Sequence, residues 1–364
     1  MKIQLKTLTP VHIGSGHELQ PNIEFLAFSD KIAVTDDEKI LQIVGKENIE
    51  DWIAIIGNPH GDLRQILEQG GRRVSAEEVA SRILDKASIA PSKAIRAQLH
   101  SGNGKAIIPG SSIKGAIRTA IFADFINDNQ KMVAQKDSLG TYDRSNRFRY
   151  GDEGLQKTIF GKDPNHDIMR LLQVGDAHFE KTTCYKTQVL NKHFEKWEIK
   201  TEIEQNVEAI AAETTSEIRI NVNETLFLAG DKARLFKKNA IDLELINLFR
   251  LINKHTGILL SEEIDFWRND TNSPKALGTY IDDLEILLDR CDNPTADECV
   301  LRLGFGIGFR SITGDWQGAM NGDDYRQLVK TVRPKHPDHI LFPKTTRFAE
   351  GGAPLGFIKL KILN

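Results

Sequence analysis

Polar and apolar residues alternate at both ends of this chain. Near the start, the segment Lys2–Leu8 alternates up to Pro10, and near the end Phe357–Ile362 alternates with Lys359 and Lys361 in the polar positions. A period of two is typical of a β-strand with one buried face. Both ends of the chain are therefore expected to be strands in the core of the protein.

Three segments between these ends have apolar residues at helical spacing. They lie at Ile113–Ile121, Ile241–Ile252 and Ile281–Leu288. A further helix is predicted after Ser75, because Ser-Ala-Glu-Glu is a capping box. This helix would carry Val79, Ile83 and Leu84 on one face.

Strand patterns are mixed with these helices. The candidates are Leu172–Val174, Ile218–Val222, Leu226–Leu228 and Val300–Leu303, and the polar segment Ala134–Tyr150 indicates a long loop. Because strands and helices do not alternate as regular βαβ units, the pattern favours an α+β fold over a doubly wound parallel sheet. The length of the chain favours about two domains.

Composition narrows the class of protein. Hydrophobic residues make up 40% and charged residues 27%, which is ordinary for a globular protein and excludes collagen-like or largely disordered chains. Apolar runs are far shorter than the ~20 residues that span a bilayer, and Met1–Pro10 has no signal-peptide pattern, so we expect a cytoplasmic protein without a membrane segment. Cys184, Cys291 and Cys299 have no CxxC spacing, which indicates neither a disulfide framework nor a zinc site.

The net charge of −3 conceals a strong asymmetry. Residues 326–347 contain six Lys and Arg against one Asp, whereas residues 261–298 contain three against eleven Asp and Glu, and residues 195–224 three against eight. This distribution suits one face that meets a polyanion and another that faces solvent or a basic partner, although most charged runs are merely solvated. The acidic helical region at 240–298 is expected to be an insertion between strands.

The first of four candidate binding segments, Leu8–Gly16, follows the initial strand. Gly14 and Ser15 form a turn whose backbone N–H groups would be open to a phosphate oxygen. His12 in the same segment could contact a base or act as a general base. The alternative is a proline-initiated turn in which His12 packs against the sheet.

The second segment begins a helix. Ser111 or Ser112 would cap it after Gly110, and a helix N-terminus is a natural seat for an anion. Lys114 in the first turn opposes the helix dipole, which suggests an anionic partner, and Arg118 lies one turn further along the same face. The spacing of a P-loop is absent, which argues against a nucleotide hydrolase.

The third segment is rich in glycine. It contains Gly304, Gly306 and Gly308, flanked by Arg302 and Arg310 and interleaved with Phe305 and Phe309. A glycine loop with nearby cations and aromatic rings suits a sugar-phosphate backbone and its bases. The pattern GxGxG and its late position do not fit a dinucleotide-binding unit, and a β-bulge or tight hairpin is the simpler alternative.

The fourth segment, before the final strand, adds Lys344 and Arg347 to the basic region. Elsewhere, Asp176 is an isolated turn residue of the kind that usually caps a backbone N–H group. The sequence offers no Ser/His/Asp or Cys/His arrangement, no HExxH motif and no carboxylate cluster with metal-ligand spacing. It therefore predicts neither a metal site nor a cofactor.

In this order, the glycine-rich segments resemble the RAMP (repeat-associated mysterious protein) superfamily of CRISPR systems. The resemblance rests on Leu8–Gly16, Ile108–Arg118 and Leu303–Arg310, with further similarity at Leu172–Phe179 and Pro354–Leu360. Within the superfamily, the chain is most similar to the Csm-complex subunit that caps the 3′ end of the crRNA in type III-A effectors.

The resemblance implies a fold of two ferredoxin-like (RRM-type) modules with helical insertions. We expect an N-terminal module with a helical insertion over residues 1–175 and a C-terminal module over residues 176–364. The second module would contain the glycine-rich loop and the acidic insertion at about 240–298, which would face solvent or a neighbouring protein because it repels RNA.

The resemblance also implies a role, which is that of a non-catalytic subunit of a type III-A complex. Such a subunit binds the backbone of single-stranded crRNA and contacts other Csm subunits, above all the backbone RAMP subunit. It closes the filament at the crRNA 3′ end and supports 3′-end maturation in antiviral defence by admitting host exonucleases. The expected RNA-binding residues are His12, Gly14, Ser15, Gly110, Ser111, Ser112, Lys114, Arg118, Arg302, Gly304, Gly306, Gly308, Arg310, Lys344 and Arg347.

Two other functions remain open. One is a metal-independent RAMP endoribonuclease that processes crRNA, with His12 as the general base that activates a 2′-hydroxyl, although the sequence shows no second catalytic group. The other is a nucleotide- or dinucleotide-binding enzyme, which the misplaced GxGxG pattern and the missing P-loop spacing disfavour.

Overall fold

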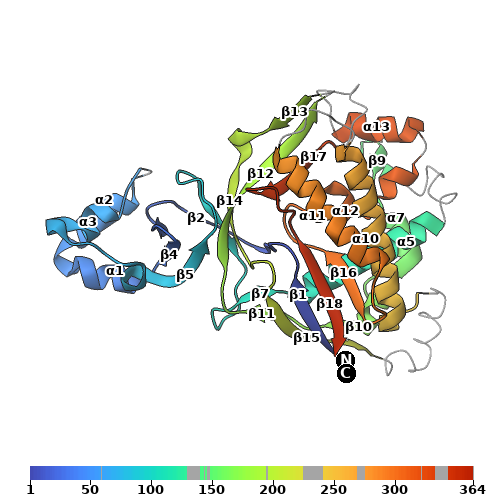
Figure 1. The fold of residues 1–364 in the computed structure, drawn as a ribbon, viewed down its shortest axis with the longest axis horizontal. Coiled ribbons are helices and arrows are strands. Elements are labelled where there is room, and N and C mark those ends of the chain that lie inside the picture. The colour runs from blue at the N-terminus through green and yellow to red at the C-terminus, as the bar shows by residue number, and fades with distance from the viewer. Residues whose placement is uncertain are drawn as a thin grey trace.

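The computed structural model describes residues 1–58, 60–128, 140–142, 144–145, 148–193, 196–223, 241–268, 275–320, 322–332 and 343–363. Three parts follow one another along the long axis of the molecule in Figure 1. A small N-terminal lobe lies at one end, a large curved sheet crosses the middle, and a second sheet covered by helices forms the other end. The two chain termini lie next to each other.

A five-stranded antiparallel sheet contains both ends of the chain. Its strands, in spatial order, are β10 (Leu172–Val174), β15 (Thr215–Val222), β1 (Lys2–Thr7), β18 (Phe357–Leu363) and β16 (Glu298–Arg302). Lys2 lies opposite Leu363 across the pair of terminal strands, which explains why the termini are adjacent. The structure confirms the two terminal strands, and Ile3 and Leu5 are fully buried.

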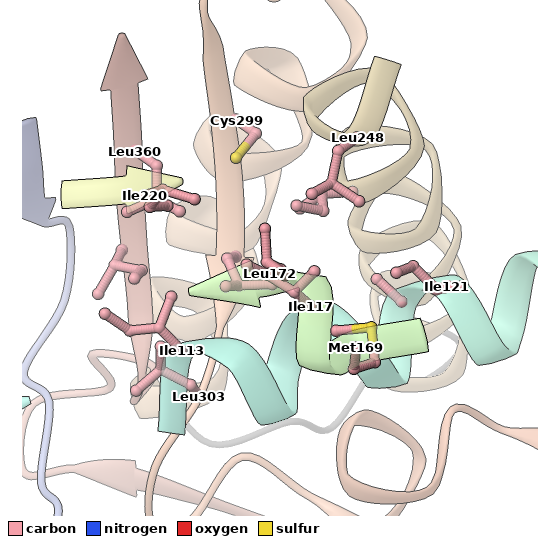
Figure 2. Packing of buried hydrophobic residues seen from close by; sticks show 14 of the residues in the cluster. Ile113, Ile117, Ile121, Met169, Leu172, Ile220, Leu248, Cys299, Leu303 and Leu360 are labelled. Carbon is pink, nitrogen blue, oxygen red and sulfur yellow. The ribbon is translucent and has the colours of Figure 1, made fainter. Parts of the chain in front are cut away.

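Two long helices cover one face of this sheet. They are α5 (Gly110–Asp128), which precedes β10, and α10 (Leu245–Arg268), which follows β15. Figure 2 shows Ile113, Ile117 and Ile121 of α5 and Leu248 of α10 gathered around the strand residue Leu172. The order β1-α5-β10-β15-α10-β18 and its strand pairing are those of a ferredoxin-like module, to which β16 adds an edge strand.

This module is built from both halves of the chain. Strands β1 and β10 come from residues 1–175, whereas β15, β16 and β18 come from residues 176–364. The expected division between residues 175 and 176 therefore does not separate two sheets. The α+β class agrees with the structure, but the two expected modules do not follow one another along the chain as residues 1–175 and 176–364.

The acidic region is part of the core and is not an insertion. Leu248, Phe249 and Ile252 of α10 are fully buried against the sheet. The next helix, α11 (Lys275–Asp292), packs beside α10 and buries Tyr280 and Leu284. Most of the acidic residues lie on the outer sides of these helices, with the largely buried Glu263 as an exception, and the apolar stripes face inward. The expectation of an insertion was therefore wrong.

The large curved sheet in the middle of the molecule has nine strands. Along its main path lie β2 (Gly14–Leu19), β6 (Ile95–Gln98), β14 (Gln205–Ala209), β12 (Thr183–His193), β5 (Ala80–Lys86), β4 (Lys31–Thr35) and β3 (Phe25–Ala27), while β13 (Lys196–Ile199) and β17 (Thr345–Ala349) pair with β12. The pairs β12–β5 and β14–β6 are parallel, and the other pairs are antiparallel. This order is not that of a ferredoxin-like module.

Short helices pack on the strands β3, β4 and β5 to form the N-terminal lobe. They are α1 (Asp37–Val44), α2 (Ile49–Ile56), α3 (Arg64–Leu67) and α4 (Ala76–Val79). The capping box is present, since Ser75 and Glu78 exchange hydrogen bonds at the start of α4. The helix nevertheless ends after one turn and Ile83 and Leu84 lie in β5, so the predicted amphipathic helix was wrong beyond Val79.

The remaining elements are short. The strands are β7 (Ala106–Ile108) paired with β11 (Ala177–Phe179), and β8 (Gly140–Tyr142) paired with β9 (Phe148–Tyr150). The helices are α7 (Glu153–Phe160), α12 (Phe309–Thr313) and α13 (Gly322–Val332), with 3-10 turns at Lys46–Asn48, Gln69–Gly71, Ile168–Leu171, Thr201–Ile203 and Trp316–Ala319. The pair β8–β9 corrects the expected long loop between residues 140 and 150. Residues 134–139 of that loop and the strand expected at Leu226–Leu228 lie outside the described residues. Over the described ranges, every helix is too short or too polar to cross a bilayer.

Candidate nucleic-acid interface

Four segments that are distant in sequence meet around the ring of Phe305. The guanidinium carbon of Arg96, on β6, lies 5.0 Å from the ring centroid, and that of Arg347, on β17, lies 5.2 Å from it. The imidazole of His12 contacts the same ring edge-on at 5.5 Å. We call Arg96, Phe305 and Arg347 the arginine–phenylalanine cluster.

The two guanidinium groups of this cluster repel each other. Burial and the positive charge of Arg96 lower the pKa of Arg347 to about 10, so Arg347 remains charged at neutral pH. Within the described part of the chain, Arg347 has no carboxylate within 4 Å, and it donates to the Thr187 hydroxyl at 2.9 Å. The Arg96 Nε lies 3.4 Å from a Glu18 carboxylate oxygen but makes no hydrogen bond. Glu18 is the one carboxylate within 4 Å of these two cations in the described part of the chain, and Arg347 also donates to the Ile203 carbonyl at 3.4 Å. The net positive charge that remains favours a bound anion.

Glycine makes this arrangement possible. Gly304 has a φ of +94°, and a Cβ atom there would lie 2.7 Å from the His12 carbonyl oxygen. Gly306 has a φ of +78°, and its Cβ would lie 2.9 Å from Leu355 and 3.3 Å from the Arg347 side chain. Both positions therefore require glycine for conformation and for space. The loop is fixed to the first segment because the Phe305 N–H donates to the His12 carbonyl at 2.9 Å.

The first segment supplies one edge of this surface. Gly14 and Ser15 are exposed at the start of β2, and the Ser15 hydroxyl donates to the Ala97 carbonyl at 3.1 Å. Ala97 precedes Gln98 at the end of β6, next to Arg96. The predicted glycine turn thus lies beside the strand that carries Arg96.

His12 is packed inside the protein and is only 3% exposed. Its Nδ1 lies 2.6 Å from the Glu208 carbonyl oxygen, so Nδ1 carries the proton and donates. Burial lowers the pKa of His12 and keeps the ring neutral at pH 7, although the Glu208 carbonyl opposes this shift. The structure favours the packing alternative for His12, because a substrate hydroxyl cannot reach a ring with so little exposed surface.

The second segment differs from its prediction at the helix start. Helix α5 begins at Gly110, so Ser111 and Ser112 lie in its first turn and do not cap it. The Gly110 N–H donates to the Asp176 carboxylate at 2.7 Å. An acidic side chain of the protein itself therefore takes the position expected for a phosphate, and Asp176 caps a backbone N–H as predicted.

Gly110 is explained by packing. A Cβ atom at this position would lie 2.0 Å from the Val174 carbonyl oxygen, which belongs to the backbone and cannot move aside. We expect Gly110→Ala to lower the free energy of unfolding by about 1–3 kcal/mol, since it forces the helix away from β10. Chemical denaturation followed by circular dichroism measures the change.

Gly115→Ala is the matched control for this prediction. Gly115 lies in the same helix, and a Cβ atom there would have no heavy atom within 4 Å. The substitution should raise the free energy of unfolding by roughly 0.5–1 kcal/mol through helix propensity. Equal effects of the two substitutions would contradict the packing explanation.

Lys114 and Arg118 line an open groove of about 760 Å³ between α5 and α7. Arg118 is held in place, because it pairs with Asp167 at 2.7 Å and stacks 3.7 Å over the Phe160 ring. Burial lowers the pKa of Lys114, and within the described residues no carboxylate lies within 4 Å of its ammonium group. Lys114 is therefore the more available cation of the two.

The other predicted cations do not lie in the arginine–phenylalanine cluster. Arg302 is buried, with 6% of its side chain exposed, and pairs with Glu263 at 2.7 Å. Arg310 lies in the first turn of the short helix α12, after Gly308, and pairs with Glu262 at 2.7 Å. Lys344 is 9% exposed. The position of Arg302 in the core corrects its assignment as an RNA contact, because an outside ligand cannot reach it.

Comparison with known proteins agrees with the fold. The sequence model of the RAMP superfamily matches residues 4–314. A Methanocaldococcus jannaschii protein named "CRISPR system Cms protein Csm5" is 23% identical over 394 residues, covering 100% of this chain and 89% of its own length. These matches extend over nearly all of the chain.

Two solved structures have a similar fold. One chain of a "Csm-crRNA-target RNA ternary complex in type III-A CRISPR-Cas system" matches with a TM-score of 0.72 and 21% identity, over 99% of this chain and 100% of its own. The crystal structure of T. onnurineus Csm5 matches with a TM-score of 0.63 and 19% identity, over 98% and 99%. The whole chain thus shares its architecture with these proteins.

Proposed function

The chain belongs to the RAMP superfamily, and we propose that it is a non-catalytic crRNA-binding subunit of a type III-A CRISPR effector complex. The observation that carries this proposal is the contact of two cations, Arg96 and Arg347, with the same Phe305 ring. The similarity to two Csm5 proteins and to a chain of a Csm complex supports it.

The chemistry of the arginine–phenylalanine cluster suits binding to the sugar-phosphate backbone of RNA. A guide RNA varies in sequence, so a subunit that binds every guide must contact phosphate and sugar. Guanidinium groups bind phosphate oxygens through paired hydrogen bonds, and the exposed glycine turn at Gly14 leaves room for the backbone to approach. Lys114, in the groove beside α5, is a further proposed phosphate contact.

We place this subunit at the 3′ end of the crRNA, in the cytoplasm, next to the backbone RAMP subunit. There it would close the filament and support maturation of the 3′ end by admitting host exonucleases. Cleavage by the chain itself is the less favoured alternative, because His12 is buried and its Nδ1 is engaged by a backbone carbonyl. This placement rests on the similarity to Csm5.

The proposal is tested with the purified full-length chain and fluorescent single-stranded repeat–spacer RNAs of two unrelated guide sequences. We expect similar dissociation constants for both guides, no requirement for metal, and a log–log salt slope of about 0.7 per phosphate contact. Fluorescence anisotropy between 50 and 200 mM salt, a range over which such slopes are resolved, measures all three. Binding confined to one guide would contradict the proposal.

Incubation of the same RNAs separates binding from cleavage. We expect intact RNA with the wild-type chain in EDTA, and the same result with His12→Ala. Cleavage by the wild-type chain that His12→Ala abolishes would favour the endoribonuclease.

A further inference from the structure

Helix α2 exposes an unusually apolar surface. Six of its eight residues are apolar, and none of the eight is buried. Trp52 and Ile55 contact the small hydrophobic cluster of the lobe from one side. A helix that is apolar around most of its circumference is normally buried, so α2 has more apolar surface than the lobe covers.

Three isoleucines form the uncovered part of this helix. Ile49 is 39% exposed, Ile53 is 61% exposed and Ile56 is 45% exposed. Their spacing of four and then three residues places them along one stripe. We call this stripe the α2 face. Contiguous exposed apolar residues of this kind mark interaction sites in soluble proteins.

The α2 face lies far from the proposed RNA contacts. Figure 1 places α2 at the tip of the N-terminal lobe, at the opposite end of the long axis from α5 and α10. The strands β3, β4 and β5 separate the lobe helices from β6, which carries Arg96. The α2 face is therefore a second surface and not an extension of the cluster.

Acidic residues flank the isoleucines in the sequence. Glu47, Glu50 and Asp51 are exposed, and no cation of the described residues lies within 4 Å of their carboxylates. Between residues 45 and 57, Lys46 is the single Lys or Arg in the sequence. Such a border repels RNA phosphates and attracts lysine or arginine.

We propose that the α2 face binds another protein subunit of the same effector complex, through an apolar groove that lysine or arginine residues border. An apolar centre with a charged rim is the usual anatomy of a protein interface. Isoleucines at positions i, i+4 and i+7 match the way in which a helix enters such a groove. The choice of a complex subunit as the partner rests on the proposed function.

Ile53→Asp tests this proposal in the complex co-expressed from the tagged chain, the other Csm subunits and crRNA. We expect about tenfold less of the partner subunit on the tagged chain, because a buried carboxylate disrupts the apolar centre. Binding of RNA by the isolated chain should stay within twofold of wild type. Ile286→Asp is the matched control, since Ile286 is 55% exposed on α11 and should retain the partner.

A charge reversal tests the border. Glu50→Lys combined with Asp51→Lys should reduce the amount of partner subunit that stays on the tagged chain. A larger amount would contradict the proposal that lysine or arginine residues border the partner's groove. A dimer of the isolated chain that Ile53→Asp abolishes would identify a second copy as the occupant and overturn the proposal. Normal assembly of Ile53→Asp overturns the α2 proposal alone. A wild-type chain that recruits neither RNA nor subunits overturns the proposed function as well.

Discussion

Glu263→Ala is expected to lower the free energy of unfolding by about 3–5 kcal/mol. Arg302 is buried and pairs with Glu263 at 2.7 Å, and the Tyr280 hydroxyl also donates to Glu263. Without the carboxylate, the guanidinium keeps its charge inside the core with no counter-charge. An unfolding entropy of about 2.1 cal/mol/K per residue converts the loss into a fall in Tm of roughly 4–7 °C, which calorimetry at pH 7 measures.

Glu262→Ala is the control for this substitution. Glu262 is the neighbouring residue and also pairs with an arginine, Arg310, but 46% of its side chain is exposed. An exposed ion pair contributes about 1 kcal/mol or less, so Tm should hardly change. The double substitution Glu263→Leu with Arg302→Met should recover most of the loss, because it removes both buried charges together. A Tm for Glu263→Ala equal to that of Glu262→Ala would contradict the buried-pair explanation.

The burial of Arg302 could not be predicted from the sequence. Arg302 stands two residues before Gly304, where an arginine beside a glycine loop indicates a phosphate contact. The residues that bury it, Glu263 on α10 and Tyr280 on α11, are separated from it by 39 and 22 positions. Only the packing of α10 and α11 over β16 and β18 decides that this arginine lies inside.

The terminal strands were predictable because their pattern is local. Lys2–Leu8 and Phe357–Ile362 each alternate with a period of two. Ile3, Leu5, Ile358 and Leu360 are buried as expected, and Ile362 is half-buried. The helical spacing of α5 and α10 was equally clear. The acidic composition of the region around α10 nevertheless suggested an insertion, although Leu248 and Ile252 already marked the stripe that faces the sheet.

Only part of the candidate site could be predicted from the sequence. Arg347 and the glycine loop were found, but Arg96 was missed, because it is an isolated arginine on a short strand. Its place follows from the pairing of β2 with β6, in which Glu18 lies opposite Arg96. Long-range pairing of this kind leaves no local pattern, so an arginine on a half-buried strand has the same appearance whether or not it binds RNA.

The combined substitution of Arg96→Gln and Arg347→Gln is expected to weaken RNA binding about 100-fold, and each single substitution about tenfold. A hydrogen bond to a charged group contributes about 1.5–3 kcal/mol, and tenfold corresponds to about 1.4 kcal/mol. The salt slope should fall by about 0.7 for each phosphate that the variant no longer binds. Anisotropy titrations of the two guide RNAs at several salt concentrations measure both quantities, and the weakening should be the same for both guides.

The free energy of unfolding of the Arg96 variant distinguishes a role in RNA binding from a structural role. Arg96 Nε has no hydrogen-bond partner and Arg96 repels Arg347, so Arg96→Gln should leave the free energy of unfolding within about 0.5 kcal/mol of wild type. Arg64→Gln is the matched control, because Arg64 also lies over an aromatic ring, 4.9 Å from the Phe28 centroid, but on the N-terminal lobe. It should leave RNA binding unchanged. If Arg96→Gln instead destabilised the fold and left RNA binding intact, the two cations on the Phe305 ring would be a packing feature, and the proposed interface would lose its main support.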